Sequence, residues 1–147
     1  MKHFLASRDH NCFGCGNRNP HGLKLHFTKK NNMISGKFNS SKLFEGFPNI
    51  LHGGIQSTIL DEAMNWLFFI EGIFVVTTKI ELKFRLPIPI NESIIITAEE
   101  IEQNKKFYRA KGKIMLQSGD IATESYGEFY TMNENQKHVI IEHFSKS

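Results

Sequence analysis

Most of what this 147-residue chain reveals lies in one segment, Leu51-His52-Gly53-Gly54-Ile55-Gln56-Ser57-Thr58-Ile59-Leu60-Asp61-Glu62. Two glycines follow a histidine, and an amphipathic helix then begins. Glycines at such a point permit a tight turn and let a ligand approach the backbone. The first N–H groups of a helix lack internal partners and carry the positive end of the helix dipole. The segment therefore predicts a binding place for a polarised carbonyl oxygen, with Asp61 as the reacting carboxylate.

The segment continues into one long helix, which we predict from about residue 55 to residue 70, with Gly72 as its stop. On a 3.6-residue wheel one face is apolar and wide enough to pack against a sheet. That face carries Ile55, Ile59, Ala63, Trp66, Leu67 and Ile70. Ser57, Thr58, Asp61 and Asn65 lie on the other side. We therefore expect Asp61 to face a cleft or a partner chain, away from the main core of its own subunit.

Alternating apolar and polar residues predict strands on both sides of this helix. The predicted strands are residues 23–27, 33–38, 80–86, 93–101, 109–116 and 121–131. Strands, one long helix and further strands make an α+β fold. We predict a single domain over residues 1–147, with an irregular lead-in at 1–22. The polar tail at 133–147 is predicted to be either a short helix or disordered.

The motif His52-Gly53-Gly54, six residues and then Asp61 resembles the hot-dog thioesterases, in particular the PaaI-like acyl-CoA thioesterases. Thr77-Thr78, followed by a strand that ends at Pro87, also fits, as does the segment from Cys12 to Leu23. The resemblance covers roughly residues 12–131. It implies the hot-dog fold, a curled antiparallel sheet wrapped around one long central helix.

The resemblance implies hydrolysis of an acyl- or aryl-acyl-CoA to the free acid and CoA. In that reading Gly54 N–H polarises the thioester carbonyl, and Asp61 either activates a water or attacks as nucleophile. Thr77 would hold the water. Simpler interpretations exist: Gly54 serves only the turn, Asp61 is a solvated helix residue, and Thr77 is an ordinary strand former.

Other residues are candidates for supporting roles. The resemblance implies an active-site place for His52, although the residues themselves favour a ring that holds the glycine turn. The expected substrate-binding residues are Gly53, Asn49, Gln56, Asn65, Phe68 and Thr78. Some relatives carry an asparagine six residues before the histidine. Here that residue is Gly46, so either Asn49 substitutes for it or the role is absent.

Spacing along the helix predicts a shared active site. Gly54 and Asp61 are seven residues apart, which is roughly 10 Å at about 1.5 Å per residue. One helix can hardly bring both groups to a single carbonyl carbon, whereas two antiparallel helices from two subunits can. We therefore expect a homodimer or a dimer of dimers (a homotetramer), with sites at the subunit interface, as the resemblance also implies.

Glu62 and the pair Cys12 and Cys15 each have two competing interpretations. Glu62 falls at the edge of the apolar stripe, which favours a structural hydrogen bond or ion pair over catalysis. Cys12-x-x-Cys15, with histidines nearby, raises the question of zinc, but a zinc site prefers four ligands and this spacing supplies half of them. The sequence therefore favours a glycine-rich turn, and we expect no metal and no cofactor.

Composition narrows the class of protein. A net charge of +3 is too small to imply nucleic acid, and no recognised nucleic-acid motif is present. No apolar run is long enough for a membrane span, and residues 1–10 do not read as a secretory signal. Two cysteines give no disulfide framework, so we expect a cytoplasmic protein. Basic side chains lie on the outward faces of strands, either solvated or facing CoA phosphates: Lys83, Arg85, Lys105, Lys106, Arg109, Lys111 and Lys113.

Two rival functions remain at this stage. One is a hydratase or dehydratase of the same fold, which would use an Asp/His pair. The other is an acyl-CoA-binding sensor without turnover. The acyl preference depends on pocket shape, for which we expect Met64, Phe68 and Phe69 to matter, together with a partner chain.

Overall fold

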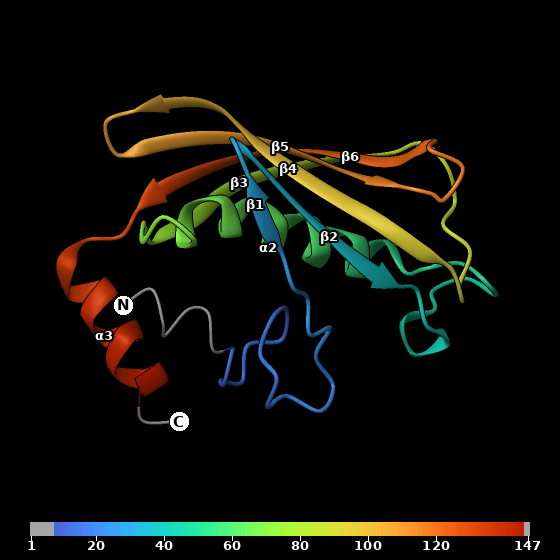
Figure 1. Ribbon diagram of the computed structural model, residues 1–147, viewed down its shortest axis with the longest axis horizontal. Helices are drawn as coiled ribbons and strands as arrows, with labels where there is room; N and C mark the ends of the chain where they lie inside the picture. The colour runs from blue at the N-terminus through green and yellow to red at the C-terminus, as the bar shows by residue number, and fades with distance from the viewer. Residues whose placement is uncertain (1–7, 146–147) are drawn as a thin grey trace.

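The computed structural model describes residues 8–145 and shows a curled antiparallel sheet over one long helix (Figure 1). The strand order is β1-β2-β4-β5-β6-β3, with β1 and β3 as open edges. The strands are β1 (Thr28–Lys30), β2 (Met33–Asn39), β3 (Val75–Phe84), β4 (Ser93–Asn104), β5 (Phe107–Met115) and β6 (Ile121–Thr131). The helices are η1 (Lys42–Phe44), α2 (Gly53–Phe69) and α3 (Glu134–Ser145). The predicted hot-dog architecture is confirmed.

Helix α2 begins two residues earlier than predicted. His52 is its N-cap, and its ring Nδ1 accepts a hydrogen bond from Gly54 N–H at 2.8 Å. The two glycines therefore form the first turn of the helix itself. Capping by a side chain satisfies one of the N–H groups that a helix start leaves without a partner.

The predicted stop of α2 at Gly72 is confirmed. Gly72 has a φ of +78°, which glycine adopts without strain. Its N–H bonds the carbonyl of Phe69, and the N–H of Ile73 bonds the carbonyl of Phe68. This pair of bonds is the Schellman arrangement that ends many helices.

The buried face of α2 is broader than the predicted stripe, because the sheet curls around the helix. Ile59, Leu60, Ala63 and Met64 are all fully buried, whereas Ile55 at the predicted edge is only half-buried. The core consists of this face and the inner side of the sheet. It includes Ile34, Ile94, Ile96, Ile114 and Phe129.

The first predicted strand, residues 23–27, is largely wrong. Its alternate side chains are buried as expected, but no strand pairing forms before Thr28. The N–H groups of Leu23 and Leu25 instead bond the carbonyls of Phe13 and Gly14 in the lead-in. The alternating pattern therefore predicted which side chains are buried, but the backbone of this segment pairs with the lead-in and not with a strand.

Further boundaries differ from the prediction, including the end of β4 and both ends of β5. Strand β3 begins at Val75, so Thr77 and Thr78 lie inside it instead of before it. Of the two alternatives for the tail, the structure has the helix, α3. The first seven residues of the lead-in and the last two of the tail lie outside the described residues, as does most of the segment tested for a secretory signal. Between residues 8 and 145, no helix is both long and apolar enough to cross a membrane.

The described part of the lead-in stays irregular and packs against α2 on the side away from the sheet (Figure 1). Its contact with the helix is close, because Cys12 Sγ lies 3.9 Å from Glu62 Oε1. The helix is therefore covered on one side by the sheet and on the other by this loop.

Candidate active site

Three polar side chains from two elements meet at Asp61. Thr77 Oγ1, from β3, donates to Asp61 Oδ1 at 2.7 Å. Asn65 Nδ2, one turn further along α2, lies 3.2 Å from the same oxygen and 3.1 Å from Thr77 Oγ1. It also donates to the Asp61 carbonyl at 2.8 Å. Two neighbours thus hold the carboxylate in one orientation. Asn65 is itself held by the Asp61 carbonyl, and Thr77 by its place in β3.

A β-bulge selects Thr77 over Thr78 as the partner of Asp61. Thr77 lies opposite Phe129 of β6, whose side chain is fully buried on the inner face. The pairing shifts between Thr77 and Lys79, and after the shift Ile80 lies on the inner face. Under strict alternation Thr78 would share that face with Ile80. The bulge inserts one residue and so turns Thr77 toward α2.

The environment of Asp61 favours a basic carboxylate. The side chain is half-buried, and this burial raises the pKa of Asp61 above its ordinary value. The hydrogen bonds from Thr77 and Asn65 act in the opposite direction, lowering the pKa. Asp61 does not enter the core, as predicted.

The start of α2 changes the expected oxyanion donor. Gly54 N–H already donates to His52 Nδ1, so it is not available to a ligand in this conformation. His52 has the structural role that the residues favoured. Gly53 N–H has no hydrogen-bond partner among the described residues. A Cβ on Gly53 would meet only the ring of Phe84, at 3.6 Å, and Gly53 lines a cavity at this helix start.

A cavity of about 710 Å³ opens beside this helix start. Its lining comes from the loop before α2, the first turn of α2 and the end of β3: Glu45, Gly46, Phe47, Ile50, Leu51, His52, Gly53, Gln56, Phe84, Arg85, Leu86 and Pro87. Asp61 is absent from this lining. Eight residues separate Gly53 from Asp61, or about 12 Å along the helix. One chain therefore holds the two halves of the expected site apart.

Three residues expected to bind substrate have their polar groups engaged inside the protein. Gln56 is 4 % exposed; its Nε2 donates to the Leu51 carbonyl, and its Oε1 accepts from the Thr123 hydroxyl. Thr78 donates to the carbonyl of Glu128 at 3.1 Å. Asn65 serves Asp61 and Thr77. These side chains support the site structurally, and the substrate contacts expected for Gln56, Thr78 and Asn65 stay predictions.

Phe68 and Met64, which we expected to shape the substrate pocket, lie in the core of the subunit. Phe68 is 2 % exposed and packs against the rings of Tyr108 and Phe129, and Met64 is fully buried. Both side chains belong to the core, because the curled sheet reaches further around α2 than a flat one would. Phe69 is half-buried beside Phe74 and Trp66.

The loop before α2 explains the glycine found at position 46. A Cβ there would lie 2.9 Å from His52 Cα, so a larger residue would push the capping histidine away. Asn49 has a φ of +66°, and its N–H donates to Glu45 Oε1 at 2.5 Å. Asparagine tolerates this conformation better than most residues, so its place is explained by the turn. The structure brings Asn49 to neither Asp61 nor the cavity.

Several basic side chains on the outward face of the sheet are paired with carboxylates. Arg85 contacts Glu124, Lys111 contacts Glu99, and Arg109 contacts Glu102. This is the solvated face that one interpretation predicted. Lys83 and Lys113 also line a second hollow of about 760 Å³, which lies over strands β3 to β6.

Glu62 makes the structural hydrogen bond that its place on the wheel predicted. Its Oε1 accepts from Trp66 Nε1 at 3.3 Å. Sequence reasoning missed its second neighbour, the lead-in cysteine pair. No spacing signal links positions 12 and 15 with position 62, because only the packing of the lead-in on α2 joins them.

No family model matches the chain. Among curated proteins it is 28% identical over 85 residues to the acyl-coenzyme A thioesterase THEM4 of Rattus norvegicus. The matched segment covers 56% of this chain and 36% of that protein. It is 20% identical over 101 residues to the uncharacterized mitochondrial membrane protein FMP10 of Saccharomyces cerevisiae, covering 66% of this chain and 41% of that protein. The chain thus spans less than half the length of these curated relatives.

Solved structures share the fold at low identity. A thioesterase superfamily protein, RHA08564, aligns with a TM-score of 0.76 at 18% identity, over 81% of this chain and 62% of that one. The PaaI protein of E. coli aligns with a TM-score of 0.70 at 15% identity, over 76% of this chain and 81% of that one. A hypothetical thioesterase of Streptococcus pneumoniae, solved with coenzyme A, aligns with a TM-score of 0.70 at 14% identity, over 74% of this chain and 89% of that one. The chain therefore shares the fold of these solved structures.

Proposed function

We propose that this protein is an acyl-CoA thioesterase, which hydrolyses the thioester of an acyl- or aryl-acyl-CoA to the free acid and CoA in the cytoplasm. The observation that carries the proposal is the Asp61–Thr77–Asn65 cluster on a helix whose start opens into a cavity. The fold, the similarity to a named acyl-CoA thioesterase and the structural relative with bound coenzyme A support a CoA ester as the ligand.

The proposed roles follow from which groups are free to act. Gly53 N–H, at the positive end of the helix dipole, polarises the carbonyl, in place of the expected Gly54. Asp61 either takes a proton from the attacking water or attacks the carbonyl carbon itself. In the first route water adds to the carbonyl carbon, the C–S bond breaks, and the carboxylic acid and CoA thiol leave. In the second route the C–S bond breaks as the acyl group bonds to Asp61 in a mixed anhydride, CoA thiol leaves, and water then hydrolyses the anhydride to the carboxylic acid and free Asp61. Thr77 orients the Asp61 carboxylate through its 2.7 Å hydrogen bond.

We propose that each active site joins Gly53 of one subunit to Asp61 of its partner, in a homodimer or a dimer of dimers. Support comes from the separation of the two groups along α2 and from the cavity lining, which lacks Asp61. Edge strand β3 also carries exposed apolar side chains, with Phe84 57 % and Val76 38 % exposed. Phe47 and Leu86, beside the cavity, are exposed as well. A second copy of the chain would cover these groups.

The rival functions have weaker support. A hydratase or dehydratase would use His52 together with Asp61, but His52 Nδ1 already accepts the Gly54 N–H as the cap of α2, and the spacing from His52 to Asp61 resembles the thioesterase pattern. A sensor has no need for a carboxylate held by two hydrogen bonds. Hydration of crotonyl-CoA tests the first rival, and tight binding of CoA esters without turnover would establish the second.

The proposal is tested by following CoA release with a thiol reagent across a panel of acyl- and aryl-CoA esters. Wild type is compared with Asp61→Asn, which keeps the shape of the side chain and removes its charge. Because Cys12 is itself partly exposed, a protein-only blank is subtracted. Loss of a positioned general base typically costs about 10²- to 10⁴-fold in rate. Wild type that binds the esters without releasing thiol would overturn the proposal.

Glu71→Gln is the matched control for this experiment. Glu71 is an exposed acid just after the same helix, and it pairs with Lys29 at 2.7 Å. Its removal leaves the Asp61 cluster untouched, so CoA release stays at the wild-type rate.

A further inference from the structure

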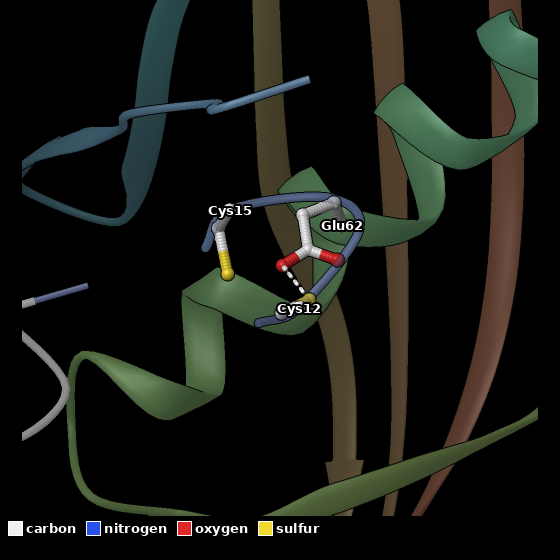
Figure 2. Close-up of side chains that lie close together, drawn as sticks. All are labelled: Cys12, Cys15 and Glu62. Atoms are coloured by element: carbon white, nitrogen blue, oxygen red, sulfur yellow. Dashed lines mark hydrogen bonds between the residues drawn. The ribbon is translucent and has the colours of Figure 1, made fainter. Parts of the chain in front are cut away.

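The lead-in cysteines and Glu62 form a compact group on the side of α2 that faces away from the sheet (Figure 2). Cys12 Sγ, Cys15 Sγ and a Glu62 carboxylate oxygen all lie within 4.8 Å of one another. The separation between Cys12 Sγ and Glu62 Oε1 is 3.9 Å. Two thiol sulfurs and one oxygen thus lie close together, although they come from a loop and a helix far apart in the sequence.

The turn that carries the two cysteines is built tightly around glycine. Gly16 N–H bonds the Cys12 carbonyl at 2.9 Å, which closes the turn. A Cβ on Gly16 would lie 2.3 Å from the His10 carbonyl oxygen and 2.5 Å from Cys12 N, so no larger residue fits. The turn therefore holds the two cysteines at fixed positions. The thiolate is the form of cysteine that binds metals.

A second glycine admits the carboxylate. A Cβ on Gly14 would lie 2.5 Å from Glu62 Oε2 and 2.6 Å from its Cδ. The glutamate reaches the cysteine pair only because position 14 has no side chain. The loop sequence and the helix residue therefore fit each other as one site.

The group lacks a paired positive charge. None of the ion pairs among residues 8–145 involves Glu62, whose carboxylate accepts from Trp66 Nε1 at 3.3 Å and lies 3.9 Å from Cys12 Sγ. Thiolates and a carboxylate brought together at a half-buried place are costly unless a cation joins them.

We propose that Cys12, Cys15 and Glu62 bind a divalent ion of the zinc type, through two thiolates and one carboxylate oxygen. Sulfur ligands favour zinc over magnesium or calcium, and three protein ligands leave the fourth tetrahedral position for water. The bound ion ties the lead-in to α2 beside Asp61. Sequence alone favoured a metal-free turn because it supplied only the cysteine pair. The third ligand comes from the tertiary structure.

The test uses the full chain without a histidine tag, reduced, stripped with a chelator and then titrated with Zn²⁺ against a chromophoric chelator. Co²⁺ serves as the spectroscopic probe. We expect one ion per chain and a thiolate-to-cobalt charge-transfer band. Loss of a ligand in Glu62→Gln weakens the affinity by more than about tenfold, since even groups that only support ligands contribute that much. Asp61→Asn, a neighbouring carboxylate on another face of α2, leaves the affinity unchanged.

Two further measurements keep the test decisive if Glu62→Gln folds poorly. Gly14→Ala retains every ligand but displaces the carboxylate, so it also weakens binding. In wild type, saturating Zn²⁺ slows alkylation of Cys12. The proposal is overturned if the reduced chain takes up neither ion, if it forms a Cys12–Cys15 disulfide in place of binding, or if Cys12→Ser/Cys15→Ser binds as tightly as wild type. Unchanged affinity in both Glu62→Gln and Gly14→Ala would also overturn it.

Discussion

At the scale of single residues, Thr77 tests whether the Asp61 cluster acts in the reaction. Its hydroxyl donates to Asp61 and accepts from Asn65. Thr77→Val keeps the shape and removes both bonds. Hydrogen bonds to charged groups contribute about 1.5–3 kcal/mol, so we expect kcat to fall by roughly tenfold or more while KM for the CoA ester changes little.

The matched controls for Thr77 are in the same strand and at the same position. Thr78→Val loses only a bond to the Glu128 carbonyl, outside the cluster, and should keep the wild-type rate. Thr77→Ser restores the hydroxyl and should restore kcat. Equal rates in Thr77→Val and wild type would show that Thr77 does not orient Asp61.

Gln56 gives a prediction about stability at the same scale. Its buried amide joins the Leu51 carbonyl to the Thr123 hydroxyl of β6. Gln56→Leu leaves that hydroxyl buried without a partner, which costs about 1–3 kcal/mol of unfolding free energy. Urea denaturation measures the loss.

The double variant Gln56→Leu/Thr123→Val checks the cause. With both polar groups removed, no unpaired hydroxyl is left, so most of the lost unfolding free energy should return. A double variant that is less stable than the single one would mean that packing, not the hydrogen bond, explains the loss.

At the scale of elements, the end of α2 depends on one backbone conformation. Gly72 has a φ of +78° and holds the closing bonds to Phe68 and Phe69 in place. Gly72→Ala forces a Cβ into the left-handed region, at a cost of about 1–2 kcal/mol. Chemical denaturation should therefore show a lower unfolding free energy.

Asparagine at the same position separates backbone strain from loss of space. Because asparagine tolerates the left-handed conformation, Gly72→Asn should cost clearly less than Gly72→Ala. Equal losses would point to crowding around residue 72 in place of strain.

The elements also differ in how well periodicity predicted them. Strand β6 matches its predicted range, residues 121–131, and β2 extends one residue beyond its own. Both lie in the interior of the sheet, and burial alternates along most of their length. The start of edge strand β3 was harder to predict, because its bulge shifts the alternation of inward and outward side chains between Thr77 and Lys79. A bulge depends on pairing with β6, which no local pattern records.

At the scale of the whole molecule, a mixed-dimer experiment tests the shared active site. Gly53→Pro removes the proposed donor N–H at a helix position that accepts proline well. Asp61→Asn removes the carboxylate. Each variant alone should be inactive. If a site takes one group from each subunit, a dimer with one copy of each variant has one intact site and one doubly damaged site.

After the two variants are mixed and re-equilibrated, we expect about a quarter of wild-type CoA release, because half of the dimers are mixed and each has one intact site of two. The mixture is compared with each variant alone, treated identically. An inactive mixture that contains mixed dimers by mass spectrometry would place both groups within one subunit.

The sequence by itself determined the central helix, its stop at Gly72 and most of the strands. These follow from 3.6- and 2-residue periodicities and from backbone limits on glycine, which are local properties of the chain. Only the tertiary structure decided that Thr77 meets Asp61, that Phe68 belongs to the core, and that Gly54 N–H is occupied by His52. It also placed Glu62 beside Cys12. Each of these depends on which distant segments pack together, and the energy of such packing belongs to pairs of surfaces that no local pattern in one segment contains.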